Sequence, residues 1–97
     1  MKIEEIKKPD LMNIDINNKD HILYLCIEFS DVFYFKNEVE DIEIDMSSHI
    51  VKITRRELVD DSFFGKLYKK TVMRLQWHVV DHETLRWEAC NFYIDGM

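Results

Sequence analysis

The stretch VEDIEIDMSSHIVKIT, residues 39–54, carries the clearest structural pattern in the chain. From Val39 to Met46 apolar and acidic side chains alternate, as expected for a strand that buries one face. Ser47-Ser48 is predicted to turn the chain, so that Ile50–Thr54 returns as the second strand of a hairpin. The predicted cross-strand pairs match in character, which supports this register: Glu43 with Lys52, Asp41 with Thr54, Ile44 with Val51 and Ile42 with Ile53.

A second hairpin is predicted from Thr71–Val80 and Leu85–Ile94, which Asp81–Thr84 connects. A uniform register gives this hairpin a core face and a mixed reverse face. The core side pairs Trp77 with Glu88, Leu75 with Cys90, Met73 with Phe92 and Thr71 with Ile94. The reverse side pairs Val72 with Tyr93, Arg74 with Asn91, Gln76 with Ala89, His78 with Trp87 and Val80 with Leu85.

The other apolar segments are assigned by their length and spacing. His21–Phe29 is apolar on both faces and predicts a central strand. Val32–Phe35 predicts a further strand and Leu11–Ile16 a weaker one. Arg56–Lys70 is the best helix candidate, because its apolar residues recur at helical spacing: Leu58, Val59, Phe63, Phe64, Leu67 and Tyr68. Residues 1–8 fit either a frayed strand or a short helix.

The predicted fold class is mainly β (α+β). We expect an antiparallel β-meander of about 5–6 strands, as a curved sheet or a small sandwich, with one short helix packed on it. Residues 1–97 are expected to form a single globular domain, in which residues 1–10 are the part open to fraying.

Composition narrows the class of protein. The chain is 46% hydrophobic and 33% charged, which excludes a disordered tail. Two cysteines cannot build a disulfide scaffold. The longest apolar run, Ile22–Ile27, is far shorter than the ~20 residues of a membrane span. The N-terminus carries acids and lacks the apolar core of a secretory signal. We therefore expect a soluble, reduced, cytoplasmic protein.

Charge is distributed unevenly along the chain. The formal net charge is −6, and residues 1–51 contribute −7 while residues 52–97 contribute +1. Such an acidic chain repels nucleic-acid phosphates at long range, so nucleic acid is an unfavoured partner. The acids from Glu38 to Asp45 have two readings: a solvated strand face, or a docking stripe for the lysines and arginines of a protein partner.

No catalytic or cofactor-binding motif is present in the sequence. His78 and His82, with Asp81, Glu83 and Cys90 nearby, are conceivable metal ligands, but a surface histidine paired across strands is the simpler reading. Cys26 and Cys90 lie in apolar segments and are expected to be small buried hydrophobes. We therefore predict no catalytic residue, no metal and no cofactor.

The resulting hypothesis is a non-enzymatic, acidic protein-binding module that neutralises a basic partner such as a toxin nuclease. In size and charge alone, the chain resembles bacterial toxin-immunity proteins and phage-encoded inhibitors. A homo-oligomeric structural or accessory β-domain and, less favoured, a histidine-based metal-binding domain are the alternatives. The predicted partner-binding residues are Glu38, Glu40, Asp41, Glu43, Asp45, His78, Trp87 and Tyr93. The alternative for Trp87 is that the helix covers its face and makes it a core residue.

Overall fold

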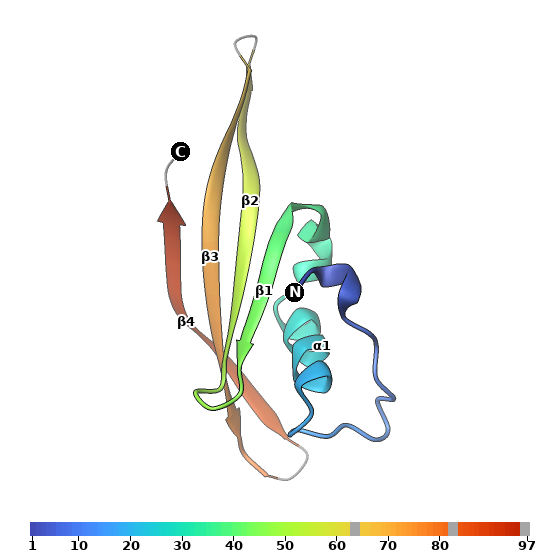
Figure 1. Cartoon of the computed structure of the whole chain (residues 1–97). Coiled ribbons are helices and arrows are strands. Elements are labelled where there is room, and N and C mark those ends of the chain that lie inside the picture. Colours follow the sequence, from blue (N-terminus) through green and yellow to red (C-terminus); the bar gives the residue numbers. More distant parts are fainter. Residues whose placement is uncertain (63–64, 82–83, 96–97) are drawn as a thin grey trace.

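The computed structural model describes the backbone of residues 1–62, 65–81 and 84–95, and the side chains of residues 1–60, 65–81 and 84–87. Within these residues, four strands form one antiparallel sheet in the order β1–β2–β3–β4, so each strand pairs with the next (Figure 1). The fold is mainly β with helix packed on the sheet, as predicted, but the sheet has four strands rather than five or six. The strands are β1 Val39–Asp45, β2 Ile50–Ser62, β3 Gly65–Val79 and β4 Leu85–Asp95.

Residues 21–29, predicted to be a strand, instead belong to a helix, α1 (Lys19–Phe29). Asn18 begins it, because its side-chain oxygen accepts hydrogen bonds from the amides of Asp20 at 2.9 Å and His21 at 3.4 Å. Five of the six residues from 22 to 27 are buried. A helix that is buried on most sides requires the same continuous apolar sequence as a central strand. The prediction for His21–Phe29 was wrong for this reason.

The remaining N-terminal segments are short helices and turns. Residues 3–5 form a 3-10 helix, η1 (Ile3–Glu5), which agrees with the short-helix reading of residues 1–8. Residues 32–38 form a second 3-10 helix, η2 (Val32–Glu38), so the strand predicted over Val32–Phe35 is wrong. Leu11–Ile16 is not a strand either, because Asp10 accepts bonds from Met12 and Asn13 and holds the chain in a turn.

The core lies between α1 and one face of the sheet. The helix supplies Ile22, Leu23, Cys26 and Ile27, each at most 1% exposed. The sheet residues that complete the core alternate along their strands, as a one-faced sheet requires: Ile42, Val51, Ile53, Leu75 and Trp77. Among the described residues, no helix is long and apolar enough to cross a membrane.

The β1–β2 hairpin has the predicted register. All four predicted pairs are present, including Glu43 with Lys52 and Ile42 with Ile53. The turn is held by Asp45, whose carboxylate accepts hydrogen bonds from Ser47 and Ser48. His49 completes it with a positive φ of 60°. These serine hydrogen bonds lower the pKa of Asp45 to about 2.

Residues 56–70 were predicted as a helix, but residues 56–62 and 65–70 of this segment are the paired ends of β2 and β3, which continue past the rest of the sheet (Figure 1). Arg56 pairs with Lys70, Leu58 with Tyr68, and Ser62 with Gly65. Gly65 has a φ of 126°, which glycine adopts readily at such a turn. Of the apolar stripe that favoured a helix, Leu58, Val59 and Leu67 are 40%, 55% and 51% exposed, so these side chains are not covered by the core. Phe63 and Phe64 lie outside the described residues.

The β3–β4 hairpin has the predicted register over only half its length. Thr71 to Arg74 pair as predicted, with Ile94 to Asn91 in reverse order. The register then shifts by one residue, so that Trp77 pairs with Trp87 and His78 with Arg86. The predicted pairs from Leu75 onward are therefore wrong, because a bulge adds a residue to β4 without leaving a pattern in the sequence.

Candidate partner-binding surface

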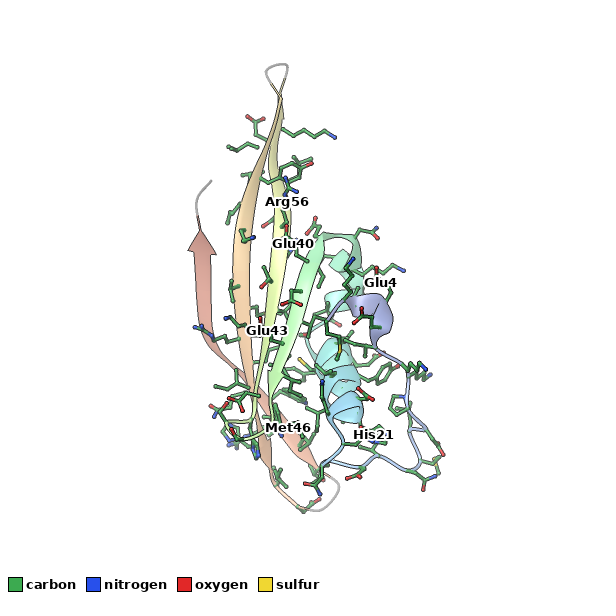
Figure 2. The ribbon with its side chains drawn as sticks, in the orientation of Figure 1. Glu4, His21, Glu40, Glu43, Met46 and Arg56 are labelled. Carbon is green, nitrogen blue, oxygen red and sulfur yellow. The ribbon has the colours of Figure 1, made fainter. Side chains whose placement is uncertain are left out.

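The acids predicted to bind a partner lie where β1 begins and along it, and several are already paired within the chain. Glu38 bonds Arg55 at 2.5 Å, Glu40 lies 3.3 Å from Lys70, and Glu43 lies 3.9 Å from Lys52. Figure 2 shows Arg56, Glu40 and Glu43 in succession along the sheet. A cationic partner at these acids would therefore compete with intramolecular cations, whose exposed pairs contribute about 0–1 kcal/mol each.

Asp41 and Asp45 have structural partners. The N-terminal ammonium of Met1 donates to the Asp41 carboxylate at 2.6 Å, and this hydrogen bond lowers the pKa of Asp41. The amide of Ile42 in turn donates to the carbonyl of Met1 at 2.8 Å, so the N-terminus covers part of the outer edge of β1. Asp45 is the turn residue described above. Glu38, Glu40 and Glu43 are therefore the acids of this set whose salt bridges a partner could exchange most simply.

The shift in register separates two residues that were predicted to share a face. Trp87 lies on the helix side of the sheet, 5.6 Å from the Trp77 ring and 6.1 Å from the Phe29 ring. His78 pairs with Arg86, one position along β3 from Trp77, and so projects to the opposite face. The backbone pairs Tyr93 with Val72, and the Tyr93 side chain lies outside the described residues. Partner contact by these three residues stays a prediction.

Among the described side chains of the sheet, the most exposed apolar group was not predicted. We call residues 56–62 of β2 and 65–69 of β3 the arm. β1 pairs with β2 only as far as Arg55, and β4 pairs with β3 only from Lys70, so the arm is two strands wide. It contributes to the length of the molecule, which measures 53 Å by 24 Å by 17 Å. The sequence signal for it was the opposite charge of Glu57 and Lys69, which pair across the hairpin.

An open pocket of about 370 Å³ lies where the arm leaves the sheet. Arg56, Leu58 and Tyr68 line it from the arm, and the guanidinium of Arg56 stacks 4.0 Å above the Tyr68 ring. The junction of η2 and β1 supplies the other wall, which includes Glu38 and Glu40. Two of the predicted partner-binding acids are thus brought together with apolar and aromatic groups, in a setting able to seat a side chain with an apolar stem and a cationic end.

The candidate metal and thiol sites are only partly described. In the described residues, no three histidine, cysteine, aspartate or glutamate side chains are close enough to hold a metal ion. His82, Glu83 and the side chain of Cys90 lie outside those residues. Cys26 is fully buried, which confirms its prediction as a core residue, and burial raises the pKa of its thiol to about 12. A thiol with that pKa is protonated at neutral pH.

Comparisons with known proteins add no assignment: no family model, curated protein or solved structure matches this chain.

Proposed function

We propose that this chain is a non-enzymatic protein-binding module that acts in the cytoplasm and occludes a functional surface of a basic protein, as an inhibitor or immunity protein does. The observation that carries the proposal is the arm, a projecting hairpin whose described side chains include the exposed apolar groups of Leu58, Val59 and Leu67. Projecting apolar groups beside charged ones are typical of protein-interaction surfaces.

The negative net charge of the chain supports the proposal that its partner is basic. The chain has a net charge of −6, which increases the rate of encounter with a positively charged protein. Glu38 and Glu40 stand beside the pocket at the base of the arm, so the acidic and apolar elements of the surface are adjacent. Among the predicted acids, Glu38 and Glu40 lie next to an exposed apolar surface. Asp41 and Asp45 instead accept hydrogen bonds that hold the N-terminus and the β1–β2 turn.

A homo-oligomeric β-domain is the second candidate. The same exposed arm favours it, because unpaired strand edges also pair with copies of the same chain. Light scattering at two concentrations separates the candidates, since a monomeric binding module keeps one mass at both.

The proposal is tested by capture and reconstitution. Immobilised chain is exposed to native lysate, bound protein is identified, and the complex is rebuilt from two purified components. We expect a basic protein, one-to-one stoichiometry, and an association rate that falls as salt rises. Loss of the partner's own activity in the complex would complete the case for an inhibitor.

Two charge variants make the test specific. Glu40→Lys should slow association, whereas Glu4→Lys changes the net charge equally from η1, away from the arm (Figure 2). A partner that is acidic, or an association rate that both variants and salt leave unchanged, would contradict the proposal.

A further inference from the structure

The arm has an edge of β2 without a neighbouring strand in the described part of the chain. β2 runs to Ser62, but β1 pairs with it only from Ile50 to Arg55. Residues 57–62, which we call the arm edge, therefore present on that side the backbone N–H and C=O groups that a sheet would pair. A shift in register between Leu58 and Asp60 interrupts this row at Val59. An exposed row of this kind is a template for an added strand.

The arm also lacks the support that stabilises a hairpin. A two-stranded ribbon is at best marginally stable in water, and a third strand supplies the missing pairing. On the arm edge, Leu58 and Val59 are 40% and 55% exposed. An added strand would cover part of both side chains while it satisfied the backbone.

The composition of a matching strand can be read from β3, which already pairs with the other side of the same residues. Lys69 lies opposite Glu57, and Tyr68 lies opposite Leu58. Because the side chains of a strand stand between its two neighbours, the arm edge presents the same groups to a strand on its free side. Residues 57–62 contain three acids and no base. A complementary segment is therefore basic, with apolar or aromatic residues between its lysines or arginines.

The pocket at the base of the arm lies at the end of this edge. A strand antiparallel to β2 would continue the line of β1 and end beside Glu38 and Val39. Its last outward side chain would meet Leu58 and the carboxylates of Glu38 and Glu40, beside Arg56, which stacks on Tyr68. It would take over these carboxylates from Arg55 and Lys70. An arginine or lysine fits these groups, because its stem is apolar and its end is cationic.

We propose that the basic partner adds an extended segment antiparallel to the arm edge, residues 57–62 of β2, and seats a cationic side chain in the pocket beside Glu38 and Glu40. This inference rests on the proposed function and names the mode of recognition. The occupant is a segment of another protein, because a second copy fits the arm edge poorly. Pairing of two arm edges about a two-fold axis would bring the three acids of each chain together. The β3 edge of a second copy could pair with this edge only head to tail, which leaves an unpaired arm at each end.

The first test uses a defined probe, the capped peptide GKLYKKT, which copies residues 65–71. Its titration into isotopically labelled chain is followed by the backbone amide resonances. We expect saturable shifts in residues 56–62 and at Glu38 and Glu40. The same peptide with glutamate in place of its three lysines should leave them unmoved. Unmoved arm resonances at millimolar peptide, or equal binding of the glutamate peptide, would overturn the inference.

Variants locate the site. Asp60 is exposed on the arm edge and pairs with Leu67 rather than with a lysine, so Asp60→Lys should preserve the hairpin and weaken the peptide about threefold to fivefold. Glu4→Lys makes the same charge change on η1, away from the arm, and should leave the affinity unchanged. Equal weakening by both variants would show that only net charge matters.

The reconstituted complex separates failure of this inference from failure of the proposed function. Amide hydrogen exchange should slow at those amides of residues 57–62 that point to the open edge when the partner binds. If a basic partner binds one to one and leaves these amides unprotected, the function stands and strand addition is wrong. If the same amides become protected as the isolated chain is concentrated, the occupant is a second copy and the proposal is overturned.

Discussion

Replacement of Asn18 tests whether residues 19–29 are held as a capped helix. The Asn18 side-chain oxygen accepts from the Asp20 amide at 2.9 Å and, at a longer 3.4 Å, from the His21 amide. Loss of such a cap costs typically about 1 kcal/mol, and glycine in its place costs only a few tenths. We therefore expect the free energy of unfolding to be highest for the unmodified chain, slightly lower for Asn18→Gly and lowest for Asn18→Ala.

Urea unfolding, followed by tryptophan fluorescence, measures this order. Thermal unfolding is a second measurement of the same order: for a domain of about 100 residues, a loss of 1 kcal/mol in the free energy of unfolding lowers the melting temperature by roughly 4–8 °C. Asn17→Ala is the matched control, because the backbone amide of Asn17 donates the hydrogen bond to Asp15, and the variant keeps this amide. An Asn18→Ala protein as stable as the unmodified chain, or equal losses at positions 17 and 18, would refute the capped helix.

Three further outcomes follow from the described core and turn. Ile53→Ala should destabilise the fold by about 2–5 kcal/mol in urea, because Ile53 is 1% exposed beneath α1; a loss below 1 kcal/mol would contradict its place in the core. Because the pKa of Asp45 is lowered from 3.8 to about 2, its ionisation stabilises the fold above about pH 4, and this contribution is lost as the pH falls towards 2. Asp45→Asn should flatten that part of the stability curve, and an unchanged curve would exclude the turn hydrogen bonds as its cause. In a Cys90→Ser background, native Cys26 should react with a thiol reagent only after unfolding, and fast labelling at neutral pH would show that it is accessible.

The parts of the fold in which acidic and apolar residues alternate along a strand could be predicted from the sequence. The β1–β2 register followed from one acidic and one apolar face, and it is correct to the residue from Asp41 to Thr54. The two faces of such a strand differ in chemistry, so a slip of one residue would expose its aliphatic side and bury its acids.

The errors arose where a local pattern had two physical meanings. An apolar run such as Ile22–Ile27 fits a buried helix as well as a central strand, and only the cap at Asn18 indicates which forms. Residues 56–70 have helical spacing, yet their cross-strand charges and the turn at Gly65 fit a hairpin. Spacing alone carries no information about whether a core is available to cover the stripe.

The candidate site was predicted in part. Glu38 and Glu40 were chosen for their charge, and the fold places both beside the pocket at the base of the arm. Their intramolecular partners, Arg55 and Lys70, come from two other strands and could not be assigned before those strands were placed. Trp87 was predicted to share a face with His78, but the bulge near Leu75 reverses the alternation beyond it. Trp87 packs on the helix side against the core, as the alternative reading of Trp87 had it.

Hydrogen exchange of the free chain over residues 56–70 tests most directly whether this segment is an extended arm. In a two-stranded ribbon, every second amide of a strand points to an open edge and exchanges quickly, while its neighbours are bonded across the hairpin. We predict this alternation along 56–58 and 66–69. Continuous protection of successive amides through the segment, as an α-helix gives, would contradict the arm and the strand addition proposed for it.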